Sequence, residues 1–279
     1  MRPESLSPRT APAPSPERLG AVARRVRELA AAYEPPSYAH VPDPDAALFL
    51  CAVDHGTGYR GRYLVDGRGP FAGSALLWAV GLRAARRRPG LLSAAALREI
   101  SAEGVAEIFR IGGETVADPE RRAALWRDLA RGLERDHEGR ASALLAAAGG
   151  RLGGRGGLLE LLGRYEAYAD PLRKKAFLLA KICERRGWLS VSDPESWEVA
   201  ADNVLMRLAL RSGLVASGER EVVRAATRAA FKQVAEAAGL PVPVLDDLLW
   251  ELGRDDPDLL GTAGGDVREP ERDPALAWY

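Results

Sequence analysis

The stretch that decides the fold is DNVLMRLALRSGLV, residues 202–215. Asp202 precedes apolar residues at helical spacing, and Gly213 follows them where helices commonly end. An Asp directly before such a run is typical of a helix N-cap, because its carboxylate accepts hydrogen bonds from the first free amides. The stretch therefore predicts one amphipathic helix, and a cap alone is a sufficient explanation for Asp202.

The same spacing recurs along most of the chain. We expect helices near residues 17–30, 45–53, 71–87, 93–100, 119–138, 158–168, 172–186, 219–238 and 244–253, with a short helix after Ser101. Asp45 is the expected cap of the second helix, and Asp66-Gly67 predicts a hairpin turn. The predicted fold class is all-α, with about ten helices and at most one small β-hairpin.

Composition shifts mark the expected domain limits. Residues 1–16 contain five prolines and predict a disordered tail. No linker rich in Pro, Ser or charge interrupts the middle, so residues 17–260 predict a single domain. Residues 261–279, with their glycines and acidic residues, predict a loose C-terminal tail.

The charge balance limits the kinds of partner that the protein is expected to bind. Lys plus Arg equals Asp plus Glu at 39 each, so the net charge is zero. This disfavours a dedicated binder of long nucleic acid, which normally carries a positive excess. Residues 164–186 nevertheless hold seven basic residues against three acidic ones. That local excess suits a phosphate group or a short strand, and a small-molecule nucleotide is the favoured partner.

Cysteine and histidine are sparse. Cys51 and Cys183 lie far apart in apolar runs and predict buried free thiols of a cytoplasmic protein. With three scattered histidines they offer no evident metal site, and no cofactor is expected. No apolar run approaches membrane-spanning length, so no membrane partner is expected.

Two segments invite a functional interpretation. The glycine-rich residues 149–157 lack the Lys-Ser/Thr ending of a phosphate loop and no predicted strand precedes them, so a flexible connector is favoured. Asp54 and His55 begin a polar segment beside an apolar helix, where a turn and an acid–base site are equally supported.

A cationic helix start is more specific. Arg173, Lys174 and Lys175 stand on the first turn of an apolar helix, where the helix dipole disfavours cations. Compensation is expected from Asp170, a substrate phosphate or a catalytic carboxylate. The simpler interpretation, which composition favours, is that the lysines point to water.

Together, the helices that contain Lys174 and Asp202 resemble the helix-hairpin-helix glycosylase superfamily. Its members typically follow a lysine-bearing helix with a catalytic Asp that opens an apolar helix ending in Gly-Leu. Residues 245–253, which include Asp246, also resemble the closing helix of archaeal 8-oxoguanine DNA glycosylases.

The order of segments is closer to the queuosine salvage family, N-glycosidases that release queuine from queuosine 5'-monophosphate. The similarity runs from about residue 17 to about residue 260. It covers the helix at 48–53, the Gly-aromatic segment at 71–77, residues 100–109, Lys174 to Leu179, and Ala201-Asp202-Asn203. The chain departs from the family where an aromatic-rich stretch is replaced by residues 54–58, where Tyr is replaced by Asn203, and where a His-rich C-terminal segment has no counterpart.

The resemblance implies an N-glycosidase with Asp202 and Lys174 as catalytic residues. In such an enzyme we expect Asp202 to stabilise the oxocarbenium-like sugar and Arg173, Lys174 or Lys175 to hold a 5'-phosphate, with Asp54 and His55 as the polar residues available to act on the base. Further candidates for substrate contact are Phe71, Asn203, Arg207 and Asp246.

Two other classes stay open. A base-excision glycosylase of the 8-oxoguanine type would use Lys174 as an amine nucleophile, but it needs a basic face and a glycine-bearing hairpin. Residues 165–173, where that hairpin is expected, lack Gly-x-Gly. A non-catalytic helical binding protein would leave Asp202 as a cap.

Overall fold

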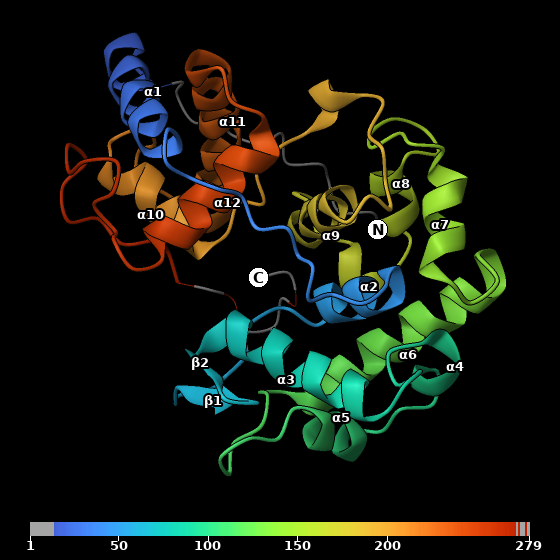
Figure 1. Cartoon of the computed structure of the whole chain (residues 1–279). Coiled ribbons are helices and arrows are strands. Elements are labelled where there is room, and N and C mark those ends of the chain that lie inside the picture. Colours follow the sequence, from blue (N-terminus) through green and yellow to red (C-terminus); the bar gives the residue numbers. More distant parts are fainter. Residues whose placement is uncertain (1–13, 272, 274–276, 278–279) are drawn as a thin grey trace, which may run out of the picture. The chain divides into compact units, whose positions relative to one another are not determined.

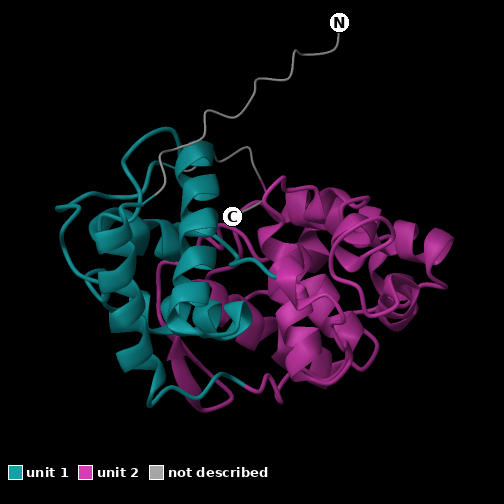
Figure 2. Cartoon of the chain, turned by 90° about the horizontal axis from the view of Figure 1, so that it is seen from above, with its two compact units in different colours: residues 1–36, 197–273 teal, residues 37–196, 274–279 magenta. Residues whose placement is uncertain are grey.

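The computed structural model describes residues 14–271, 273 and 277, so most of the predicted N-terminal tail lies outside the described residues. The described chain is all-α, with twelve α-helices and one two-stranded antiparallel sheet, which confirms the predicted fold class (Figure 1). It divides into two compact units, unit 1 (residues 1–36 and 197–273) and unit 2 (residues 37–196 and 274–279), shown in Figure 2. That the chain folds as one domain stays a prediction.

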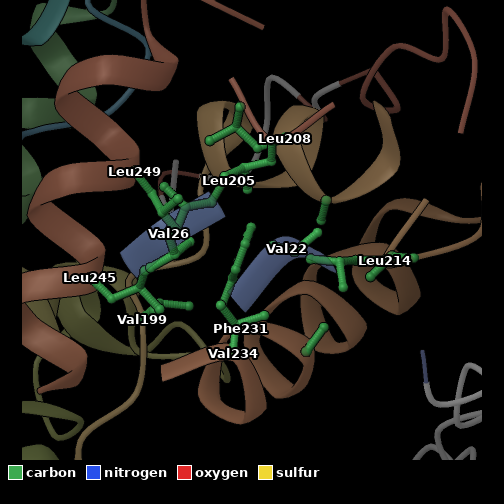
Figure 3. Packing of buried hydrophobic residues seen from close by; sticks show 14 of the residues in the cluster. Val22, Val26, Val199, Leu205, Leu208, Leu214, Phe231, Val234, Leu245 and Leu249 are labelled. Atoms are coloured by element: carbon green, nitrogen blue, oxygen red, sulfur yellow. The ribbon is translucent and has the colours of Figure 1, made fainter. Parts of the chain in front are cut away.

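Unit 1 is built around one apolar core. Its helices in the described residues are α1 (Pro16–Ala30), α10 (Asn203–Arg211), α11 (Arg220–Ala238) and α12 (Val242–Gly253). α1 packs against α11, and α10 packs against both α11 and α12. Val22 and Val26 of α1 lie in this core with Leu205 of α10 and Phe231 of α11 (Figure 3). The helical spacing of these residues gives each helix one apolar face, and burial of that face holds the unit together.

Helix α10 ends as its sequence predicts. Gly213 adopts a left-handed φ of +74°, and a side chain there would meet the backbone of Gly264. The amide of Gly264 donates to the carbonyl of Arg211 at 2.8 Å. Residues 261–271 contain no helix or strand, but this hydrogen bond ties the segment to the end of α10.

Unit 2 surrounds a helix that is buried on all sides. Every residue from Ala46 to Ala52 of α2 (Pro44–Ala52) is buried. Around it pack α3 (Gly73–Arg87), α6 (Pro119–Asp136), α7 (Ala141–Ala148) and α9 (Lys174–Arg185). The remaining helices of the described unit are α4 (Ala94–Leu97), α5 (Ala102–Ile108) and α8 (Leu158–Leu162), with 3-10 turns η1 (Glu166–Tyr168) and η2 (Pro194–Ser196).

The predicted hairpin is present. Strand β1 (Tyr63–Val65) pairs antiparallel with β2 (Arg68–Phe71) beside α3 (Figure 1). Asp66 and Gly67 both have positive φ, +50° and +75°. A two-residue turn with positive φ at both positions matches the twist of the strands, which is why Asp-Gly predicts it.

One expectation for unit 2 was wrong, and one helix was not expected. Asp43, rather than Asp45, caps α2 and accepts a hydrogen bond from Ala46 N at 2.8 Å, because Pro44 occupies the first helical position. The Asp45 carboxylate instead accepts from Ala141 N at 2.6 Å, at the start of α7. The sequence does not predict α7, since it lacks a capping side chain and its run of alanines has no clear apolar face.

The glycine-rich loop connects α7 and α8 and is held from within. The carboxylate of Asp193 accepts from Leu152 N at 2.6 Å and from Gly153 N at 2.8 Å. These amides therefore bind the chain's own anion, and the loop serves as a connector.

In the described residues no helix combines the length and apolar character needed to cross a membrane. Cys51 and Cys183 are buried free thiols, as expected.

Candidate functional site

Asp202 is the N-cap of α10, and its carboxylate accepts more hydrogen bonds than an N-cap requires. One oxygen, Oδ1, accepts from Val204 N at 2.9 Å and Leu205 N at 3.1 Å. The other oxygen, Oδ2, accepts from the indole Nε1 of Trp250 at 3.0 Å. A cap uses one oxygen. The Trp250 hydrogen bond, from a helix 48 residues away in the chain, therefore fixes the second oxygen and the orientation of the whole carboxylate.

The segment before Asp202 is also pinned. Ala200 N donates to Oδ1 of Asp246 at 2.7 Å. Arg224, whose side chain is fully buried, directs its Nε to the carbonyl of Ala201 at 3.4 Å. Asp246 is itself buried on α12, so the structure gives it a backbone partner next to Asp202. Three elements of unit 1 thus set the position of this carboxylate.

The other predicted residues of unit 1 lie on α10. Asn203 is exposed and accepts from Nη2 of Arg220 at 2.5 Å. Arg207 is partly buried and donates from Nη2 to the carbonyl of Gly253 at 3.0 Å. Arg207 therefore ties α10 to the end of α12, while Asn203 faces solvent directly after Asp202.

In unit 2, Asp170 compensates the cations at the start of α9. Its carboxylate accepts from Leu172 N and Lys174 N, both at 3.0 Å, and it is 2% exposed. This buried anion occupies the position that the helix dipole favours. Arg173 adopts a left-handed φ of +56° and precedes the helix, and both Arg173 and Lys174 are partly exposed.

The expectation that these lysines point to water was wrong for Lys175. Its side chain is fully buried, and Nζ donates to the carbonyl of Ala52 at 2.7 Å. Lys175 shares the face of Leu179 and Ile182 on α9, so helical spacing carries it into the core. The predicted phosphate contact of Lys175 is therefore not supported, and Arg173 and Lys174 remain the predicted phosphate contacts.

Each ring nitrogen of His55 faces a basic side chain. Nε2 lies 2.8 Å from Nη1 of Arg122, and Nδ1 lies 3.1 Å from Nζ of Lys175. The guanidinium is always protonated and cannot accept, so Nε2 accepts from Arg122. A neutral imidazole then carries its proton on Nδ1, and this N–H can donate to Lys175 only when the amine is uncharged.

Electrostatics agree with an uncharged Lys175. Burial lowers its pKa well below the ordinary value for lysine, and the charge of Lys174 lowers it further. The carboxylate of Asp54 raises the pKa of Lys175, whereas Arg122, which is fully buried on α6, lowers it again. The guanidinium also donates to the carbonyls of His55 and Gly56. His55 is therefore fixed in position and in tautomer.

Asp54 is buried beside this cluster. Its Oδ2 accepts from Ser74 Oγ at 2.8 Å and from Trp78 Nε1 at 3.0 Å, both on α3. Nζ of Lys174 lies 3.4 Å from the carbonyl of Asp54. The structure thus brings Asp54, His55, Lys174 and Lys175 together within unit 2. Phe71, at the end of β2, is partly exposed and pairs with Tyr63 across the hairpin.

Among the residues that sequence reasoning missed, Arg122 contacts His55, Arg224 contacts the carbonyl of Ala201, and Trp250 contacts Asp202. Arg122 and Arg224 stand on the apolar faces of α6 and α11, at helical spacing from buried Leu and Phe residues, and a cation on such a face signals a buried polar partner. No comparable signal marks Trp250 as the partner of Asp202, because their contact depends on how α10 and α12 pack.

In the described residues, no three His, Cys, Asp or Glu side chains gather as ligands for a metal ion. Folding without metal stays a prediction. No protein-family model matches this chain, and no curated protein matches it in sequence. The residues themselves therefore carry the functional argument.

Proposed function

We propose that the chain is an N-glycosidase that hydrolyses the base–ribose bond of a 7-deazaguanine-type nucleotide, such as queuosine 5'-monophosphate, and so releases the base for salvage. The observation that carries this proposal is the Asp202 carboxylate, whose two oxygens are held by α10 amides and by Trp250. Such a group is an oriented anion, and cleavage of an N-glycosidic bond needs one.

The proposed chemistry is hydrolysis without a covalent enzyme intermediate. As the bond between C1' and the base breaks, its electron pair leaves with the base and positive charge grows on the sugar. Asp202 stabilises this oxocarbenium-like state and orients the attacking water. Water supplies the oxygen to C1', and its proton goes to the departing base by way of Asp202 or solvent.

Several of the other predicted substrate contacts lie in unit 2. Lys174 and Arg173 are partly exposed cations suited to a 5'-phosphate. Asp54, which accepts from Ser74 and Trp78, is the candidate that acts on the base, while His55, whose two ring nitrogens face Arg122 and Lys175, positions that segment. The assignment of Arg173 and Lys174 rests on their charge and partial exposure, and that of Asp54 on its carboxylate and its place beside Lys174.

One observation favours a second candidate, a base-excision glycosylase with lyase activity. Lys174 Nζ makes one long contact, 3.4 Å to the carbonyl of Asp54, and its side chain is partly exposed. An amine held this loosely could attack C1' and displace the base, leaving an imine between lysine and sugar. Borohydride would reduce that imine and trap the enzyme on the DNA strand.

The deciding experiment offers the full-length protein five substrates and follows free base by chromatography. The substrates are queuosine 5'-monophosphate, queuosine, guanosine 5'-monophosphate, guanosine and a duplex that contains 8-oxoguanine. We expect release from queuosine 5'-monophosphate, with the unmodified nucleotide far slower. Release from the duplex with borohydride trapping would replace the proposal by the base-excision alternative. Binding of a nucleotide without any release would indicate a non-catalytic binding protein.

A further inference from the structure

The hairpin and α3 of unit 2 carry an unusual density of arginine. Residues 60–88 contain seven arginines and one acidic residue, Asp66. The net charge of zero hides this local excess, because acidic residues predominate elsewhere in the chain. The segment lies outside the candidate site residues except for Phe71, so the proposed glycosidase chemistry does not account for it.

Contacts with Asp66 place two of these arginines, Arg86 and Arg87, side by side. Asp66, at the hairpin turn, accepts from Arg86 at 2.7 Å and lies 3.7 Å from Arg87, both at the end of α3. Arg68 follows on the second strand. We name Arg68, Arg86, Arg87 and Arg186, which comes from the end of α9, the arginine cluster.

His40 shows that the arginine cluster converges from three parts of unit 2. Partial burial lowers the pKa of its imidazole, and the charges of Arg186, Arg68 and Arg86 lower it further. Like charges gathered in this way repel one another, so the arrangement is explained better by a polyanionic ligand than by stability.

Three of the four arginines in the cluster, Arg68, Arg86 and Arg87, are exposed and only weakly neutralised, while Arg186 is partly buried. Arg86 and Arg87 are 56% and 71% exposed at the side chain and share the single carboxylate of Asp66. Arg68 is exposed and forms no ion pair within the described part of the chain. Ion pairs this exposed contribute little, so a phosphate can displace them at low cost.

Aromatic rings accompany the cations. The rings of Tyr38 and His40 lie 6.3 Å apart, and Arg186 lies 5.0 Å over the ring of Trp188. Arginine guanidinium groups bind phosphate through two parallel hydrogen bonds, and aromatic faces stack on unpaired bases. Interleaved arginine and aromatic side chains are what a single strand with accessible bases would use.

We propose that the arginine cluster, with the rings beside it, binds the phosphate backbone of a single-stranded nucleic acid. A membrane surface fits less well, because the one large apolar side chain that is strongly exposed in the described residues is Leu64, and a single leucine anchors poorly. An acidic peptide would use the charges but not the rings. The inference is independent of the glycosidase proposal, because it concerns binding by unit 2 and no bond cleavage.

The test measures fluorescence polarisation of a labelled 12-nucleotide single strand with the full-length protein. The triple variant Arg68→Gln, Arg86→Gln and Arg87→Gln removes three exposed charges. Each phosphate contact on a single strand contributes about 0.7 to the slope of log K against log salt. The triple variant should therefore lose about 2 from that slope, and a fourfold rise in salt should weaken wild-type binding by about 18-fold more than variant binding.

The matched control is Arg131→Gln, Arg140→Gln and Arg155→Gln, which removes three exposed arginines from other parts of unit 2. It should leave both affinity and slope close to wild type. Equal weakening by the control would overturn the proposal, since binding would then follow overall charge. So would absence of binding at about 50 mM salt, equal affinity for a duplex of the same length, or tighter binding to phosphatidylserine vesicles. Retained melting temperature in both triple variants shows that folding is not the cause.

Discussion

Trp250 donates a hydrogen bond of 3.0 Å from its indole nitrogen to Oδ2 of Asp202, and this joins α12 to the start of α10. The backbone amides of α10 occupy the other oxygen. A carboxylate that only caps the start of a helix does not need a hydrogen-bond donor from a second helix. The pair therefore indicates that the orientation of Asp202, and not merely its presence, is maintained by the fold of unit 1.

Trp250→Phe should slow base release while leaving the fold intact. Phenylalanine keeps most of the packing but removes the hydrogen bond, and hydrogen bonds to charged groups contribute about 1.5–3 kcal/mol. We expect kcat to fall about tenfold or more with KM nearly unchanged. Trp188→Phe is the control, because Trp188 also has an arginine over its ring, at 5.0 Å against 5.4 Å for Trp250. Equal kcat in the two variants would show that the hydrogen bond has no catalytic role.

Asp246 is expected to act on the backbone rather than on substrate. Asp246→Ala leaves the buried amide of Ala200 without its 2.7 Å acceptor, and an unsatisfied buried group costs about 1–3 kcal/mol. Asp246→Asn keeps an acceptor oxygen, so it should melt closer to wild type. Thermal unfolding of both variants checks this. A large rise in KM for Asp246→Asn with unchanged stability would restore the predicted contact with substrate.

Helical periodicity predicted most of the fold because each helix buries one face. The apolar residues of α10 and α11 repeat at helical spacing, and Gly213 and Gly239 end these helices in left-handed conformations. In α7 nearly every residue is apolar, so its sequence shows no single apolar face, and the helix was not predicted. Because Pro44 occupies the first helical position of α2, the N-cap is Asp43 and not the predicted Asp45.

The candidate site was less predictable, because its hydrogen bonds join distant segments. Arg122 reaches His55 from 67 positions away, and Lys175 reaches it from 120 positions away. Charge alone suggested that Lys175 points to water, yet its position on the α9 face shared by Leu179 and Ile182 decides its burial. A lysine on an apolar helical face is thus a better signal than a count of charges.

An uncharged Lys175 predicts an unusual dependence of stability on pH. Its pKa is lowered in the fold, whereas in the unfolded chain it is about 10.4. Between these two values the unfolded state binds more protons, so stability rises with pH by up to about tenfold in the unfolding constant per pH unit. Between neutral pH and about pH 10, the melting temperature of wild type should therefore increase relative to that of Lys175→Met.

His55 provides an independent measure of the same cluster. Nitrogen NMR of the labelled protein should show the His55 proton on Nδ1, and Arg122→Met should abolish this preference, because Nε2 loses its donor. If the melting temperatures of wild type and Lys175→Met differ by the same amount at every pH, and NMR places the His55 proton on Nε2, then Lys175 is charged in the fold.

Lys174 is expected to contact a phosphate. Lys174→Ala should raise KM for queuosine 5'-monophosphate by about tenfold or more, which is the usual order for a charge-assisted contact, and should change KM for queuosine much less. Lys174→Arg keeps the cation and should preserve most of the affinity. If Lys174→Arg loses all turnover on both substrates, the amine itself is required, as the lyase alternative demands.

The central claim, that Asp202 is the essential carboxylate, is tested most directly by base release and melting temperature measured together for Asp202→Asn and Asp202→Ala. Asn caps a helix about as well as Asp, but its amide nitrogen cannot accept from Trp250 Nε1 as Oδ2 does. Asp202→Asn should therefore lose about as much stability as Trp250→Phe, and Asp202→Ala should lose about 1 kcal/mol more. Asn cannot stabilise positive charge on the sugar. The account therefore predicts at least about 100-fold slower base release in both variants. Near wild-type release by Asp202→Asn, with stability lost only in Asp202→Ala, would show that Asp202 is a helix cap and contradict the account.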